Sequence, residues 1–179
     1  AKAVFNIYGD IRQRIYSDVG VDNLKSINDI GNVYTLNQNY RNTKPIVEYC
    51  NDEFGLDMIG LGLDGDPVDE FAIEELNSEE RIDCVSYVID QNRMLDDKMV
   101  IIVEDVDSYI NFKEYYDGTA TLSRAVDGHS TQKTNVIDVL TVAESIGMEF
   151  SSVIVFSEGM SATEKYISCT RALKKLIVI

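Results

Sequence analysis

The sequence of 179 residues is poor in the residues from which metal sites and disulfide frameworks are built. It holds three widely spaced cysteines, Cys50, Cys84 and Cys169, and a single histidine, His129. Because no Cys-x-x-Cys or Cys/His pattern is present, neither a zinc site nor a disulfide framework is indicated. We therefore expect free thiols in a reducing cytoplasm, no metal ligands, and a loop position for His129.

Long apolar runs and basic residues are also scarce. No run approaches about 18 apolar residues, so no membrane span is predicted. The first five residues, which lack a starting Met, are interrupted by charged and polar side chains and do not resemble a signal peptide. Sixteen Lys and Arg against 31 Asp and Glu give a net charge of −15, which repels a phosphate backbone. The composition predicts a cytoplasmic chain that binds nucleic acid poorly by itself, as the acidic part of a larger binder or as a surface for basic proteins.

Short apolar runs alternate along the chain with segments of helical periodicity. Several runs, such as 99–103, lack the polar alternation of a half-exposed strand, which is typical of parallel sheets covered by helices on both faces. Residues 55–67 are interpreted as a connection that could hold a short hairpin, and 118–133 as irregular. The predicted strands are 4–8, 33–36, 71–73, 99–103, 136–141, 153–156 and 177–179, and the predicted helices are 43–54, 78–94, 108–116 and 166–176.

In a parallel sheet of this kind, ligands bind beyond the carboxyl ends of the strands. Asp10 would follow the first strand, the stretch 39–41 the second, and the stretch 144–149 the strand that ends at Thr141. We therefore expect a binding site at that edge. Each residue alone also has an ordinary structural interpretation, and Arg171 alone would be an exposed arginine in the middle of the closing helix.

Four separated stretches carry more information together than any one does alone. They are 9–16, with Gly-Asp-x-x-Gln; 36–41, ending in Asn-Tyr-Arg; 141–150, with Gly-Met-Glu; and 166–172, with Thr-Arg-Ala. In this order they resemble the third to sixth motifs of superfamily 1 helicases of the UvrD, Rep and PcrA type. The resemblance covers the chain from residue 9 to its end. It implies a three-layer α/β/α RecA-like domain of the P-loop NTPase type, the second of two motor domains that hold ATP between them.

The resemblance implies three residues near the γ-phosphate of ATP: Gln13 as a sensor, and Arg41 and Arg171 as arginine fingers. This assignment is chemically reasonable, because phosphoryl transfer needs cations where negative charge develops. Two arginines on a movable domain would also couple closure of the cleft to the state of the nucleotide.

Five further residues receive roles from the same resemblance. Tyr40 would stack on the adenine, while Gly147 and Glu149 would line the nucleotide, with Glu149 near the ribose. Tyr16 and Thr141 would lie on the nucleic-acid side, where aromatic and polar groups hold a single strand.

The parts of an ATPase site that bind magnesium are missing from this sequence. There is no Gly-x-x-x-x-Gly-Lys-Ser/Thr loop and no acidic pair before Gly9. The resemblance therefore implies that 1–20 is the tail of the first motor domain and 21–179 the second motor domain, with a reduced insertion around 55–72. ATP with Mg²⁺ would bind only with the N-terminal motor domain present, so we expect the fragment alone to be inactive and Arg171 to be exposed.

Several positions on the nucleic-acid side depart from the family pattern. Asp18 and Val19 stand where an aromatic and an arginine are usual, and Ala143 and Ile146 where a histidine and a lysine are usual. Two hypotheses follow. The chain is the C-terminal domain of an ATP-dependent DNA helicase or translocase that uses single-stranded DNA. Alternatively, it is a helicase-like ATPase module acting on a protein machine such as RNA polymerase, as in the HelD branch, or a degenerate interaction domain.

Overall fold

The computed structural model describes residues 34, 36–93, 99–124 and 135–179. The predicted strand 4–8, the boundary at residue 20, and the candidate residues Gln13 and Tyr16 lie outside this part of the chain. His129 lies outside it as well. The domain division predicted from the sequence therefore stays a prediction.

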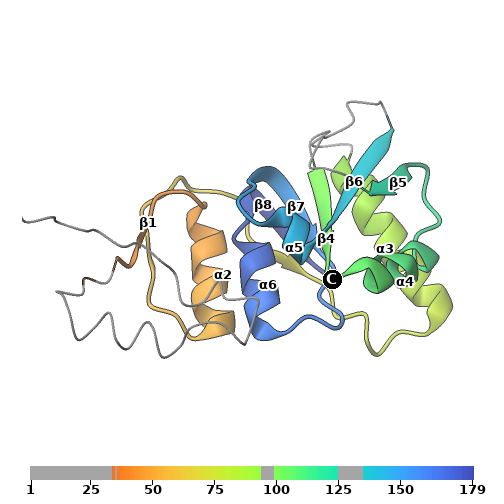
Figure 1. Ribbon diagram of the computed structural model, residues 1–179, viewed down its shortest axis with the longest axis horizontal. Coiled ribbons are helices and arrows are strands. Elements are labelled where there is room, and N and C mark those ends of the chain that lie inside the picture. Colours follow the sequence, from red (N-terminus) through yellow and green to blue (C-terminus); the bar gives the residue numbers. More distant parts are fainter. Residues whose placement is uncertain (1–33, 35, 94–98, 125–134) are drawn as a thin grey trace, which may run out of the picture.

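A sheet of six strands, all parallel, forms the centre of the molecule (Figure 1). Its spatial order is β3-β8-β7-β4-β6-β5. The central strand β4 is buried along its whole length, as its unbroken apolar sequence predicts. The strands are β3 (Asp69–Glu70), β4 (Met99–Val103), β5 (Thr121–Arg124), β6 (Val136–Thr141), β7 (Phe150–Val155) and β8 (Ala172–Val178).

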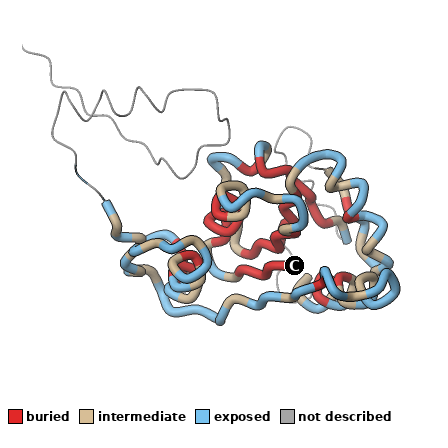
Figure 2. Tube along the Cα trace, turned by 90° about the horizontal axis from the view of Figure 1, so that it is seen from below, coloured by how far each residue is buried: buried red, intermediate tan, exposed pale blue. Residues whose placement is uncertain are grey.

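Helices cover both faces of this sheet. Val100 and Ile102 of β4 belong to the core that packs against the first group of helices given below. Met99, Ile101 and Val103 belong to the core on the opposite face of the sheet, against the second group. Figure 2 shows the buried residues mostly on the inner segments of the chain, with exposed residues around them. The first group is α2 (Lys44–Phe54), α5 (Val142–Ser145) and α6 (Ala162–Cys169), and the second is α3 (Ser78–Arg93) and α4 (Val106–Glu114). The predicted three-layer α/β/α RecA-like domain is confirmed.

A second, two-stranded sheet lies beyond α2 at one end of the molecule (Figure 1). It consists of β1 (Gln38–Asn39) and β2 (Ile59–Gly60), which pair in parallel. The predicted strand 33–36 is wrong, because Tyr34 and Leu36 are exposed and outside any strand. The short hairpin that we allowed within 55–67 is also wrong. β2 pairs with β1, which precedes α2 in the sequence, and not with another strand of 55–67.

Other boundaries differ from those predicted. The strand at 71–73 is instead β3 at Asp69–Glu70, and the helix at 108–116 begins earlier, where Asp105 caps α4 by accepting a hydrogen bond from the Ser108 N–H. The segment 118–133 contains a strand that we did not predict, β5. β5 is a strand because it forms backbone hydrogen bonds with β6, a pairing that its short sequence does not predict.

The largest correction concerns the end of the chain. The predicted helix 166–176 is α6, which begins after Ser161 in a capping box with Glu164 and ends at Cys169. Leu173 and Leu176 belong to β8. Arg171 therefore lies at the junction of helix and strand and not in the middle of a helix. No helix in the described part of the chain is long and apolar enough to cross a membrane.

Candidate functional site

The segment that follows β1 runs alongside the start of β8. Asn42 is buried and its side-chain amide donates to the carbonyl oxygens of Thr170, at 3.3 Å, and of Ala172. One residue later, the Thr43 N–H donates to the Leu173 carbonyl at 3.1 Å. These bonds bring the Asn-Tyr-Arg and Thr-Arg-Ala stretches together across about 130 residues of sequence.

Arg41 is held at the surface of this junction. Its Nη1 forms an ion pair of 3.1 Å with Oε1 of Glu149, and its Nη2 donates to the Thr170 carbonyl at 2.9 Å. The side chains of Arg41 and Glu149 remain 37 % and 45 % exposed. Arg41 thereby joins the second motif stretch to the third, through Glu149, and to the fourth, through Thr170. Its guanidinium faces solvent, and a competing anion could replace the Glu149 carboxylate.

Arg171 is buried, with only 3 % of its surface exposed, which contradicts the expectation that it would be exposed. Its Nε donates to the Ile167 carbonyl at 3.0 Å, its Nη1 to the Met148 carbonyl at 3.4 Å, and its Nη2 to the Thr170 hydroxyl at 3.2 Å. Burial lowers the pKa of the guanidinium, and the nearby Arg41 lowers it further, while Glu149 opposes the shift. In this conformation Arg171 is a structural tie between α6 and the segment before β7.

Gly147 lies in the turn between α5 and β7. Its φ of +77° is in the left-handed region, and a Cβ added there would meet nothing within 4 Å. The glycine is required by the backbone of the turn and is not needed to avoid a steric clash. It is exposed beside Met148 and Glu149, so the predicted position near a bound nucleotide is open to solvent.

The cluster of Arg41, Glu149 and Arg171 lies at the amino ends of β7 and β8. Glu149 directly precedes β7, Arg171 directly precedes β8, and the Phe150 N–H donates to the Arg171 carbonyl at 3.0 Å. We expected this site at the carboxyl ends. The expectation was wrong because β6 and β7 both run parallel to β4, so the chain between them returns across the sheet before Glu149.

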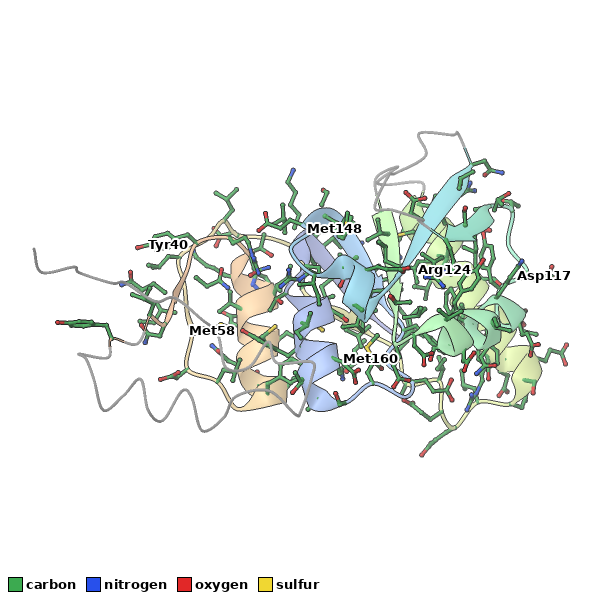
Figure 3. The ribbon with its side chains drawn as sticks, viewed as in Figure 1. Tyr40, Met58, Asp117, Arg124, Met148 and Met160 are labelled. Atoms are coloured by element: carbon green, nitrogen blue, oxygen red, sulfur yellow. The ribbon has the colours of Figure 1, made fainter. Side chains whose placement is uncertain are left out.

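Tyr40 projects from the same region and is 68 % exposed. Its hydroxyl donates to Oε1 of Gln38 at 3.0 Å, and Figure 3 shows Tyr40 at the β1 end of the molecule, apart from Met148. An exposed aromatic ring next in sequence to an exposed guanidinium suits a ligand that carries both a flat ring and negative charge.

Thr141 lies at the opposite, carboxyl edge of the sheet. It is buried, and its hydroxyl accepts from the Glu144 N–H in the capping box of α5. The Glu144 carboxylate also pairs with Arg124 at the end of β5, well away from Met148 in Figure 3. The structure therefore does not bring Thr141 together with Arg41, and the predicted nucleic-acid role of Thr141 stays a prediction.

Two findings concern metals and cysteines. In the described ranges, no group of three or more His, Cys, Asp or Glu side chains is placed to hold a metal ion. All three cysteines are free, with Cys50 and Cys169 buried and Cys84 half-buried. Arg41 and Tyr40 are both accessible to a ligand, and the cluster of Arg41, Glu149 and Arg171 supplies no ligand set for Mg²⁺.

Sequence reasoning missed Asn42, which we regard as the organising residue of the site. It also accepts a hydrogen bond from the Asn39 amide at 2.8 Å, so the loop is fixed from both sides. Its place directly before Thr43 and Pro45, which open α2, is the signal that could have indicated it.

The fold and the buried junction define a RecA-like α/β/α domain. The structure is similar to the C-terminal domain of a possible DNA helicase from Lactobacillus plantarum WCFS1, with a TM-score of 0.52 and 20 % sequence identity over 78 % of this chain and 85 % of that chain. At this identity the likeness shows the fold. No protein-family model matches the sequence. No curated protein matches it either.

Proposed function

We propose that this chain is the C-terminal motor domain of an ATP-dependent DNA helicase or translocase related to the UvrD type. One observation carries the proposal. Arg41, Glu149 and Arg171 come from three separate motif stretches, and the fold brings them into one cluster. The likeness of the fold to the C-terminal domain of a possible DNA helicase supports it.

In this proposal Arg41 acts directly on the nucleotide. Its partner Glu149 is exposed, so a triphosphate held by an N-terminal motor domain could displace the carboxylate and take the guanidinium in its place. Bidentate contact with the γ-phosphate would stabilise the charge that develops during transfer, while Tyr40 would stack on the adenine and Glu149 would turn to the ribose. Mg²⁺ and the attacking water would be held by the other domain.

Arg171 has a second role in the same proposal. Its three hydrogen bonds tie the chain before β7 to the end of α6, so it positions the backbone on which Glu149 stands. For its guanidinium to reach a phosphate, Arg171 would have to break at least the longest of these hydrogen bonds, the one to the Met148 carbonyl. Closure of the two motor domains would supply that rearrangement.

The alternative, a helicase-like module that acts on a protein machine, is favoured by the carboxyl edge of the sheet. Thr141 marks the predicted nucleic-acid side there, and Glu104, Asp105 and Glu144 lie at the ends of β4 and β6. The nearby Arg124 is neutralised by Glu144. Such an edge repels a phosphate backbone unless another domain supplies basic residues.

The test measures ATP hydrolysis by the full-length protein with and without single-stranded DNA. We expect Arg41→Ala to reduce turnover by about a thousandfold or more, because arginine fingers contribute factors of that order. Lys44→Ala is the matched control, since Lys44 is exposed and, among the described residues, forms an ion pair with Asp64 alone, at 2.8 Å. Near-normal turnover of Arg41→Ala would refute the nucleotide role. Hydrolysis that DNA does not stimulate would favour the alternative.

A further inference from the structure

The side chain of Asn39 fixes the turn that carries Arg41. Asn39 is the last residue of β1 and is half-buried. Its Oδ1 accepts hydrogen bonds from the Arg41 N–H at 2.9 Å and from the Asn42 N–H at 3.0 Å. Two successive N–H groups thus donate to one side-chain oxygen in place of a backbone carbonyl, which is a turn that asparagine favours. The backbone of Arg41 is therefore held by the Asn39 side chain.

Backbone hydrogen bonds anchor the chain before and after this turn. The Leu61 N–H donates to the Asn39 carbonyl at 2.7 Å, and the Thr43 N–H donates to the Leu173 carbonyl at 3.1 Å. Between these two anchors, the Asn39 side chain sets the path of the backbone to Arg41. Because a long side chain starts from that backbone, the turn also sets the direction in which the guanidinium lies.

A second contact of Asn39 acts on the other end of the arginine side chain. Its Nδ2 donates to Oδ1 of Asn42 at 2.8 Å, which leaves the Asn42 amide nitrogen to donate to the carbonyl oxygens of Thr170 and Ala172. The Thr170 carbonyl also accepts from Nη2 of Arg41 at 2.9 Å. Asn39 therefore supports the arginine at its backbone and, through Asn42, at an acceptor of its guanidinium.

This support matters most when Glu149 is displaced. In the structure, Nη1 of Arg41 pairs with Oε1 of Glu149 at 3.1 Å. In the proposed function a phosphate takes the place of that carboxylate, so the Thr170 carbonyl and the backbone turn are the contacts that still orient the guanidinium. A displacement of about 1 Å in a catalytic group can reduce turnover by about a hundredfold. A residue that orients Arg41 thus affects turnover without touching the nucleotide.

We propose that Asn39 is a positioning residue, which orients Arg41 toward the phosphate and does not itself contact the nucleotide. The inference rests on the proposed role of Arg41 in ATP hydrolysis. Turnover then depends on the hydrogen bonds of Asn39 only when Arg41 is present. That dependence separates positioning from a general loss of stability, which would lower turnover with or without the arginine.

The experiment measures kcat at saturating ATP in the full-length protein, with radiolabelled ATP to record slow turnover. We expect Asn39→Ala to lower kcat by about tenfold, because a misdirected arginine costs less than the loss of the arginine itself. In an Arg41→Ala background, Asn39→Ala should cause no further loss, since the residue through which it acts is gone.

Two conservative replacements of Asn39 give a graded series. Asn39→Asp loses the donor to Asn42 and keeps an oxygen that can accept from both N–H groups, so kcat should stay within about threefold of the unaltered protein. Asn39→Ser has a shorter acceptor, and its kcat should lie between those of Asn39→Asp and Asn39→Ala. A kcat of Asn39→Asp no higher than that of Asn39→Ser or Asn39→Ala would overturn the proposal.

Asn77→Ala is the matched control. Oδ1 of Asn77 accepts from the N–H groups of Glu79 and Glu80 at 3.0 and 3.1 Å, so the substitution removes the same kind of paired contact. It does so at the start of α3, at the opposite end of the molecule from β1 (Figure 1). Its kcat should equal that of the unaltered protein, and circular dichroism should show that every variant is folded.

The outcomes separate this inference from the proposed function. Equal kcat values for Asn39→Ala and Asn77→Ala would overturn positioning alone, provided that Arg41→Ala lowers turnover. A loss from Asn39→Ala that persists in the Arg41→Ala background would also overturn it, because Asn39 would then act independently of the arginine. Near-normal turnover of Arg41→Ala would refute the proposed function, and the inference would fail with it.

Discussion

Arg41 and Glu149 are 108 residues apart in the sequence, and their side chains form an ion pair of 3.1 Å at the amino ends of β7 and β8. The pair is partly exposed, while Arg171 beneath it is buried and bound to backbone carbonyls. Two arginines with the same predicted role thus have different environments, which leads to different expectations for their substitution.

Replacement of Arg171 should destabilise the fold much more than replacement of Arg41. Arg171→Met removes the donor to the partly buried Met148 carbonyl and one of two donors to the buried Ile167 carbonyl, at a cost of about 2–4 kcal/mol in the free energy of unfolding. Arg41→Met removes an exposed ion pair and should cost about 1 kcal/mol or less. Urea denaturation of both variants measures the difference, and equal costs would contradict the buried position of Arg171.

Asn42 should be among the least replaceable polar residues of the described chain. Asn42→Ala removes the donors to the Thr170 and Ala172 carbonyls and should lower the free energy of unfolding by about 2 kcal/mol. Asn111→Ala is the control, because Asn111 is exposed on α4 and should change stability by about 0.5 kcal/mol or less. A small effect at Asn42 would mean that the junction with β8 is held by other contacts.

Gly147 offers a test of backbone conformation. Its φ of +77° in open space predicts that Gly147→Ala costs about 1–2 kcal/mol, while Gly147→Asn costs less because asparagine enters the left-handed region more readily. Thermal unfolding can rank the two variants. If alanine and asparagine proved equally harmful, the φ of this turn would not be the reason for the glycine.

The three thiols should react at different rates. Burial raises the pKa of the Cys50 thiol to about 12 and that of Cys169 well above its usual value, whereas Cys84 is half-buried. At pH 8 we expect an aromatic disulfide reagent to modify Cys84 first, and Cys50 and Cys169 only after unfolding in urea. In Cys84→Ser the early phase should disappear. Retention of that phase would place a reactive thiol in the core.

The same burial makes stability depend on alkaline pH. The Cys50 pKa is 9.0 in the unfolded chain and about 12 in the folded one, so the folded state keeps its proton longer. The stabilisation is fully present below pH 9 and is lost as the pH rises toward 12, at up to about 1.4 kcal/mol per pH unit. Denaturation series at pH 8 and pH 10.5 should show a smaller loss in Cys50→Val than in the unaltered chain.

Much of the architecture could be predicted because it depends on local patterns. The apolar runs of β4 and β6, the helix opened by Thr43 and Pro45, and the long helix α3 are encoded by short stretches of sequence. The strand β5 could not be predicted, because four residues of mixed polarity become a strand only through pairing with β6.

The arrangement of the candidate site could not be predicted from the sequence. By resemblance, the motif stretches placed Tyr40, Arg41, Gly147, Glu149 and Arg171 in one group. The structure joins Arg41 to Glu149, and Arg171 to the Met148 carbonyl. Their roles in binding a nucleotide remain predictions. The sequence could not show that Arg171 is buried, because its exposure depends on carbonyl groups of residues far from it.

The sequence by itself determined the parallel three-layer fold, since the spacing of apolar residues sets which segments form buried strands and which form helices that cover them. Only the tertiary structure decided at which edge of the sheet the two arginines lie and which of them faces solvent. The physical reason is the crossing of the chain between β6 and β7, which carries Glu149 to the amino edge and places the Met148 carbonyl over Arg171.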